Sequence, residues 1–105
     1  MRRVVIESPY AGDVEANVAY ARRCLNDSLL RGESPFMSHL LYTQALDDND
    51  SFERAVGMCA GLNWLEVADA SVVYTDLGVS GGMRAGIARA EALNVPVEYR
   101  SLEAK

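Results

Sequence analysis

The stretch TDLGVSGGMRAGI, residues 75–87, has the composition of a loop that binds an anion. Gly78, Gly81 and Gly82 let the backbone approach a ligand without Cβ clashes, and Ser80 adds a hydroxyl donor. A helical pattern follows, and the free N–H groups and dipole at a helix start favour negative charge. The stretch contains neither GK[ST] nor GxGxxG, and an ordinary strand-to-helix turn also uses glycine and serine. It therefore predicts a phosphate-binding loop, with the ordinary turn as the alternative.

Two further segments carry side chains that could face the same ligand. In SPYAG, Ser8 ends a strand and Pro9 fixes the turn. Tyr10 then offers a ring on which a base can stack, or packs on the protein's own surface. His39 follows the next apolar run and is either a binding or a structural residue. The predicted ligand-binding residues are Ser8, Pro9, Tyr10, His39, Asp76, Ser80, Gly81, Gly82 and Met83.

The polar segment YTQALDDNDS is the longest irregular stretch, and long loops in compact domains are often functional. A solvated loop with a helix cap explains Asp47, Asp48 and Asp50 without chemistry. The alternatives are binding of sugar hydroxyls and a magnesium site. With His39 as the single histidine, no Cys/His cluster has zinc spacing. The sequence predicts no metal site and no resident cofactor.

The elements that would position these residues alternate between strand and helix. Apolar runs predict strands at residues 4–8, within 34–41, at 71–77 and at 95–102. Asp13 caps the first predicted helix and Gly32 ends it. Asp50 or Ser51 caps the second, which Asp69 closes, and the third follows the glycine loop. The predicted buried positions are Val14, Val18, Ala21, Cys24, Leu25 and Leu29, then Phe52, Val56, Cys59, Leu62 and Leu65, then Met83, Ile87 and Ala90. Both cysteines are predicted to be buried free thiols.

This order predicts parallel βαβ units with right-handed crossovers. We expect a flavodoxin-like α/β three-layer sandwich with a parallel sheet of four to five strands, forming a single domain over residues 1–105. Ligands of such sheets bind at the carboxyl ends of the strands, near the switch point between the first and third. The segments ESPYAGD, MSHLLYTQALDDND and TDLGVSGGM should therefore meet around one cleft.

Composition limits the partners. The net charge of −5 argues against a nucleic-acid backbone as the main partner, which needs a basic surface. No stretch approaches the ~20 apolar residues of a membrane span, so we predict a cytoplasmic protein without a membrane partner. A sheet of about four strands in so short a chain leaves edges and helix faces uncovered. This predicts a homodimer or a higher homo-oligomer.

The segments that carry a family resemblance are SPYAG, PFMSHLL with LDD, DLGVSGGMRAGIARA and VPVEY. Through these segments the chain resembles the nucleoside 2-deoxyribosyltransferase-like superfamily. The resemblance covers nearly the whole chain and is closest to small bacterial and phage members. It implies a flavodoxin-like, usually oligomeric domain. Active members cleave the N-glycosidic bond of deoxynucleosides or their monophosphates through a glutamate nucleophile in the last helix. Ser8, Pro9 and Tyr10 then match the turn at the base pocket, and Ser80 and Gly82 match positions that hold a 5′-phosphate.

The carboxylates of that family have no counterpart at the matching positions. The nucleophilic glutamate follows the loop serine by six residues, where this chain has Gly86. A second family carboxylate precedes an LxWL segment, where this chain has Gly61. Covalent glycosyl transfer needs a carboxylate at C1′ of the sugar.

The sequence therefore favours a protein that binds a nucleotide or nucleoside phosphate without efficient cleavage, for sequestration or sensing. The alternative is an N-glycosidic-bond hydrolase or deoxyribosyltransferase with rearranged catalytic acids. The carboxylates that could replace the missing ones are Glu7, Asp47 and Asp48. A third possibility is an interaction module whose pocket is vestigial.

Overall fold

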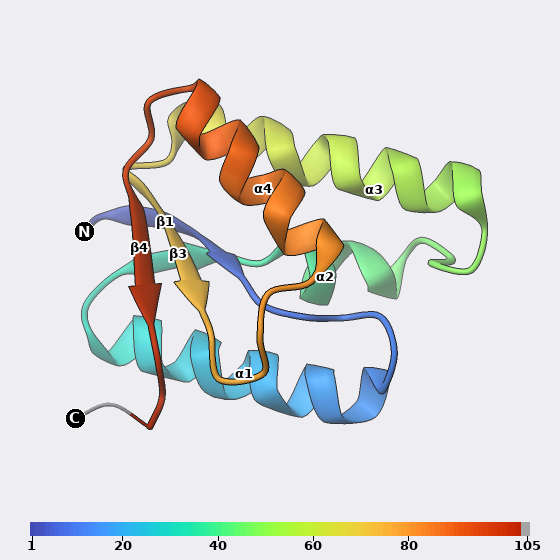
Figure 1. The fold of residues 1–105 in the computed structure, drawn as a ribbon, viewed down its shortest axis with the longest axis horizontal. Helices are drawn as coiled ribbons and strands as arrows, with labels where there is room; N and C mark the ends of the chain where they lie inside the picture. The colour runs from blue at the N-terminus through green and yellow to red at the C-terminus, as the bar shows by residue number, and fades with distance from the viewer. Residues whose placement is uncertain (104–105) are drawn as a thin grey trace.

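The computed structural model describes residues 1–103 and contains one parallel sheet of four strands (Figure 1). The strand order is β2-β1-β3-β4, which places the first and third strands side by side at the centre. This confirms the predicted flavodoxin-like α/β architecture. The strands are β1 (Arg3–Glu7), β2 (Ser34–Phe36), β3 (Ala70–Tyr74) and β4 (Val97–Arg100).

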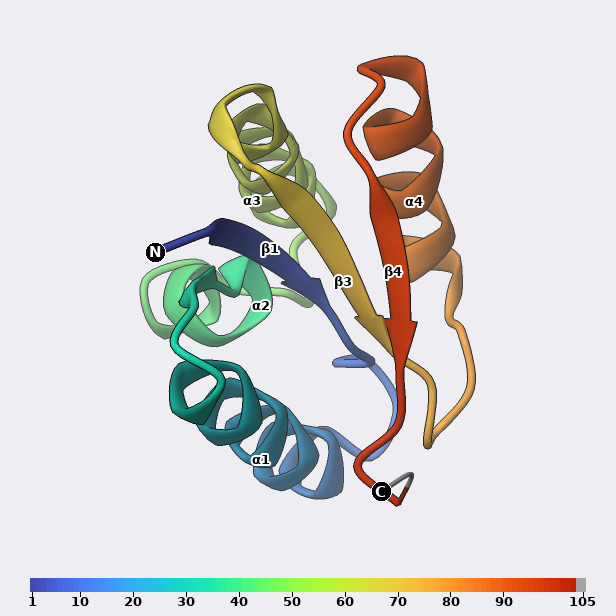
Figure 2. The same ribbon diagram turned by 90° about the vertical axis from the view of Figure 1, so that its left-hand side faces the viewer.

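The helices cover both faces of the sheet. In Figures 1 and 2, α1 lies on one face, whereas α3 and α4 lie side by side on the other. The α-helices are α1 (Val14–Leu30), α2 (Ser38–Leu41), α3 (Ser51–Asn63) and α4 (Gly81–Ala92), and two 3-10 turns are η1 (Tyr42–Gln44) and η2 (Trp64–Val67). Within residues 1–103, no helix is both long and apolar enough to cross a membrane.

The alternation of side chains along the central strands creates two cores. Val4 and Ile6 on β1 point toward α1, where they pack with Tyr20, Cys24 and others. Val5 points to the opposite face and packs with Leu65 and Ala90. Because both faces of β1 and β3 are covered, these strands are apolar almost without interruption, as expected for a buried parallel sheet.

Side-chain caps fix where the three long helices begin. Asp13 accepts a hydrogen bond from the amide of Ala16 at the start of α1, and Asp50 accepts from the amides of Phe52 and Glu53 at the start of α3. Ser80 caps α4. Such caps satisfy backbone donors that have no partner within the helix. The predicted caps at Asp13 and Asp50 are confirmed.

The predicted buried faces of the first two helices need correction. On α1, Val14 and Leu29 are exposed, whereas Tyr20, Ala21, Cys24 and Ser28 are buried. The buried face includes Tyr20, whose hydroxyl donates a hydrogen bond to Asp76 after β3.

On α3 the prediction fails over most of the helix. Phe52 is 75% exposed, and Val56 and Cys59 are also exposed, so Cys59 is not a buried thiol. The first turns of α3 project beyond the ends of the strands (Figure 1), and they therefore have no sheet to cover. The helix also ends at Asn63 rather than at Asp69, and Leu65, which is buried, lies in η2.

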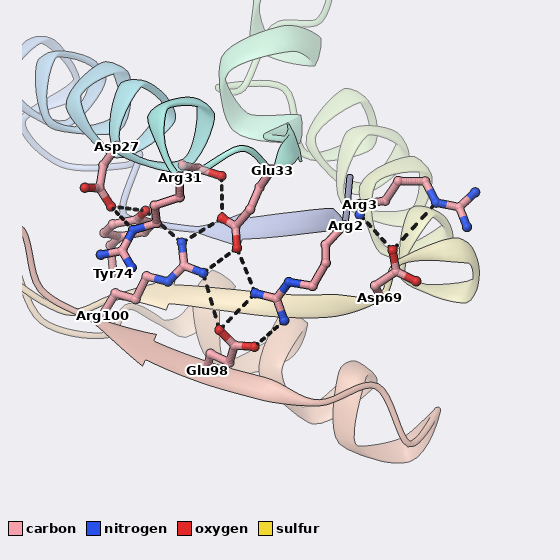
Figure 3. Close-up of polar contacts among 10 residues, drawn as sticks. Arg2, Arg3, Asp27, Arg31, Glu33, Asp69, Tyr74, Glu98 and Arg100 are labelled. Atoms are coloured by element: carbon pink, nitrogen blue, oxygen red, sulfur yellow. Dashed lines mark hydrogen bonds and ion pairs between the residues drawn. The ribbon is translucent and has the colours of Figure 1, made fainter.

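An ion-pair network holds the edges of the sheet together on the α1 side (Figure 3). Arg100 on β4 binds both carboxylate oxygens of Glu33, just before β2, at 2.6 and 2.8 Å. Arg2, just before β1, donates to both Glu33 and Glu98. Only 9% of the Arg100 side chain and 8% of the Glu33 side chain are exposed. The Arg100 hydrogen bonds hold the pKa of Glu33 down to about 2.

Candidate functional site

A cavity of about 290 Å³ lies at the carboxyl end of β1, between the start of α4 and the helices α2 and α3. The three predicted segments meet around it. The sequence-predicted site residues that line it are Ser8, Tyr10, His39, Ser80, Gly81, Gly82 and Met83. We call this cavity the cleft.

The start of α4 forms one wall of the cleft and is open to a ligand. Ser80 accepts a hydrogen bond from the amide of Met83 at 3.3 Å. That bond uses a lone pair, so the hydroxyl can still donate its proton. A Cβ added at Gly81 or Gly82 would meet nothing within 4 Å, so the space beside this backbone is empty. Gly78 has φ +85°, which explains the glycine there.

Ser8 and His39 form a hydrogen-bonded pair in the cleft. The Ser8 Oγ lies 2.6 Å from the His39 Nε2, although the two residues are 31 positions apart in the chain. Burial lowers the pKa of His39 to about 4, so its ring is neutral near pH 7. A neutral imidazole has one donor and one acceptor nitrogen, and can therefore accept from a hydroxyl. His39 lies in the short helix α2, which follows β2.

Two of the predicted residues are not brought to the cleft. Pro9 is buried and does not line the cleft. The Asp76 carboxylate accepts hydrogen bonds from the Tyr20 and Ser101 hydroxyls and from the amides of Leu102 and Glu103. These bonds tie the end of β3 to α1 and to the segment after β4. Asp76 thus anchors these segments to one another, and it does not line the cleft.

The cleft contains a carboxyl group that the predicted site set does not include. Glu7, the last residue of β1, lines the cleft and directs its side chain at α4. A Cβ built on Gly86 would lie 2.6 Å from the Glu7 Cδ and would overlap the carboxylate oxygens. Burial raises the pKa of Glu7 to about 8, so the group is largely protonated near pH 7. The space left by the glycine is thus filled by a carboxyl group from the neighbouring strand.

Gly61 is the second glycine at a position where the resemblance implies a carboxylate. A smaller group, the Ser38 side chain, fills the space beside it. A Cβ at Gly61 would lie 2.6 Å from the Ser38 Oγ and 2.7 Å from the Ser38 Cβ. Ser38 begins α2, and both residues line the cleft. Gly61 therefore lets α2 approach α3 closely, and a hydroxyl stands where the resemblance implies a carboxylate.

In the acidic loop of residues 47–50, two aspartates bind backbone amides and one lines the cleft. Asp50 caps α3, and Asp47 accepts a hydrogen bond from the amide of Asn49. Asp48 lines the cleft, as do Glu53 and Arg54 from the first turn of α3. Within residues 1–103, no group of three or more His, Cys, Asp or Glu side chains is arranged to hold a metal ion.

The sequence does not predict the contribution of α3 to the cleft, because its apolar spacing indicates a helix packed on the sheet. The lining residues that α3 contributes are Glu53, Arg54, Gly57, Met58, Gly61 and Leu62. The same expectation predicted that Phe52 and Val56 are buried, whereas both are exposed. A glycine at both positions 57 and 61 of one predicted helix was the available signal, since glycines one turn apart permit close approach of another segment.

Residues 2–100 match the family described as "Domain of unknown function (DUF7768)". The chain belongs to this family. No curated protein matches the sequence.

Among solved structures, the chain is similar to a 2-deoxyribosyltransferase from the psychrotolerant bacterium Bacillus psychrosaccharolyticus. The TM-score is 0.68, the sequences are 17% identical, and the alignment covers 98% of this chain and 74% of that chain. At this identity the likeness establishes the fold alone. It agrees with the flavodoxin-like architecture and with a deoxyribosyltransferase-like arrangement of strands and helices.

Proposed function

We propose that this protein binds a nucleoside monophosphate in the cleft. The observation that carries the proposal is the open start of α4, where Ser80 and the bare backbone of Gly81 and Gly82 face an empty space. Backbone N–H groups at a helix start, with their dipole, stabilise a phosphate. Tyr10 supplies an aromatic surface for a base, and Ser8 with His39 supplies polar groups. The deoxyribosyltransferase-like fold supports a nucleoside as the ligand.

The test is the dependence of phosphate affinity on Ser80. Ser80→Ala should weaken a deoxynucleoside 5′-monophosphate more than the matching deoxynucleoside, because only the phosphate loses a donor. One hydrogen bond to a charged group is worth about 1.5–3 kcal/mol, or roughly a ten- to hundredfold change in Kd. Titration calorimetry of both ligands measures the difference. Ser51→Ala, at the start of α3 and outside the cleft lining, is the matched control.

The result that would contradict a phosphate site is equal weakening of the two ligands by Ser80→Ala. Loss of the helix cap alone costs about 1 kcal/mol of stability and affects both ligands alike. A comparison of the two ligands on the same variant therefore separates the binding role of Ser80 from its structural role.

A second candidate function is cleavage of the N-glycosidic bond of a deoxynucleoside or its monophosphate. The glycines at positions 61 and 86 argue against the mechanism that the family resemblance implies, and favour binding alone. The carboxyl group of Glu7 in the cleft favours cleavage by a rearranged set of acids. Chromatography of purified protein incubated with each common deoxynucleoside and monophosphate distinguishes the two, because only cleavage releases free base.

A further inference from the structure

The Glu7 carboxyl group fills the space that a side chain at position 86 would occupy. The strand residue extends toward α4, and the helix residue has no side chain to exclude it. Any larger residue at position 86 would displace the carboxyl group, since a Cβ there already overlaps it. Gly86 is buried and Glu7 is partly buried, and the carboxyl group lies against the backbone of α4. The fold thus holds a carboxyl group at the α4 wall of the cleft by supplying it from β1.

The surroundings of Glu7 keep its proton in place. Burial is the cause of its raised pKa of about 8, and a neutral carboxyl group is the form that can donate a proton. Ser8 follows Glu7 in the chain and is hydrogen-bonded to His39, and this pair is also neutral near pH 7. The other titratable groups that line the cleft are Tyr10, His39, Tyr42, Asp48, Glu53 and Arg54.

Given the nucleotide-binding cleft of the proposed function, on which this inference rests, we propose that Glu7 is the catalytic acid of an N-glycosidic cleavage. Glu7 gives its proton to a nitrogen of the departing base as the C1′–N bond breaks, and the electron pair of that bond stays with the base. A water oxygen then bonds to C1′, and a proton of that water passes to the Glu7 carboxylate. The products are free base and the sugar phosphate, and Glu7 is again an acid.

The chemistry favours proton donation over direct attack. A nucleophilic carboxylate must be ionised, whereas Glu7 is neutral near pH 7 and a bound phosphate would further disfavour its ionisation. A general acid works best with a pKa near the working pH. The other two carboxylates considered from the sequence are placed differently. Asp47 does not line the cleft, and Asp48 lines it from the acidic loop, whereas the three atoms nearest to a Cβ at Gly86 all belong to Glu7.

The experiment measures binding and base release on the same samples. Wild-type protein and Glu7→Gln are incubated with the four common deoxynucleoside 5′-monophosphates, with calorimetry for binding and chromatography for free base. Glutamine keeps the size of Glu7 and removes the transferable proton. Glu91→Gln, on α4 but outside the cleft lining, is the matched control. We expect Glu7→Gln to bind within about threefold of wild type and to release base at least a hundredfold more slowly.

The pH profile separates acid catalysis from attack. Release by wild type should fall about tenfold per pH unit above pH 8, because the acid loses its proton. A rate that rises through pH 8, a smaller loss in Glu7→Gln, or a wild-type protein that binds monophosphates without releasing base would each overturn the inference and leave nucleotide binding intact. If calorimetry detects no binding of any monophosphate to wild type, the proposed function itself fails, and the inference fails with it.

Discussion

At the scale of single residues, the Glu7–Gly86 contact predicts that the effect of Gly86→Ala on the free energy of unfolding depends on Glu7. Gly86→Ala should destabilise the wild-type protein by about 1–3 kcal/mol, because the new methyl group overlaps the Glu7 carboxyl group. In a Glu7→Ala background the overlap disappears. The same substitution should then be neutral, or stabilising by up to about 1 kcal/mol, since alanine favours a helix over glycine. Urea unfolding of the four proteins measures the coupling.

Gly82→Ala is the control for that cycle. It also replaces a glycine in α4, but the added Cβ would meet nothing within 4 Å. Its effect on the free energy of unfolding should therefore be the same with and without Glu7. Equal effects of Gly86→Ala in both backgrounds would show that the two residues do not share one volume.

At the scale of elements, the contact of α2 with α3 depends on Gly61. Gly61→Ala should destabilise the protein by about 1–3 kcal/mol, because its Cβ would lie 2.7 Å from the Ser38 Cβ, which no side-chain rotation can move. Gly57→Ala, one turn earlier on α3, is the matched control. Its Cβ would lie 3.2 Å from the flexible end of Leu46, so the helix propensity of alanine should dominate. A lower melting temperature for Gly57→Ala than for Gly61→Ala would contradict this account.

At the scale of the whole molecule, the Glu33–Arg100 pair links the two edges of the sheet. Arg100→Met should cost about 3 kcal/mol, because the buried Glu33 loses its bidentate partner and keeps Arg2 and Ser28. Arg31→Met, whose partner Asp27 is more exposed, should cost less than 1 kcal/mol. Because the folded-state pKa of Glu33 is below its ordinary 4.5, this stabilisation is present above pH 4.5 and is lost as pH falls toward 2.

Denaturant unfolding of both variants at pH 7 and at pH 3 tests this assignment. The free-energy difference between wild type and Arg100→Met should shrink at pH 3, as Glu33 becomes protonated in the unfolded chain. A difference that is independent of pH would assign the loss to packing of the Arg100 stem and not to its charge.

The homo-oligomer predicted from the sequence stays a prediction. Apolar side chains exposed on α3 and η2 are the surface that a second copy would cover, and they are Phe52, Val56, Met58, Trp64 and Val67. Light scattering at micromolar protein measures the mass directly.

Much of the fold was predictable because its signals are local. Apolar runs marked the buried parallel strands, and Asp13 and Asp50 marked helix starts by their capping chemistry. The predicted stripe on α3 failed because helical spacing of apolar residues does not say what, if anything, lies against that face. Likewise, Asp76 has the character of a ligand-binding carboxylate in sequence, but the donors that occupy it come from α1 and the segment after β4.

The sequence by itself determined the order of elements, the parallel sheet, and the segments that meet at the carboxyl ends of its strands. These follow from patterning and from the handedness of βαβ units, which act between neighbours in the chain. Only the tertiary structure decided which groups face one another across the cleft. The pairing of Ser8 with His39, and the filling of Gly86 by Glu7, join positions 31 and 79 residues apart. Such contacts depend on how strand ends and helix axes are placed in space, which residue spacing along the chain does not encode.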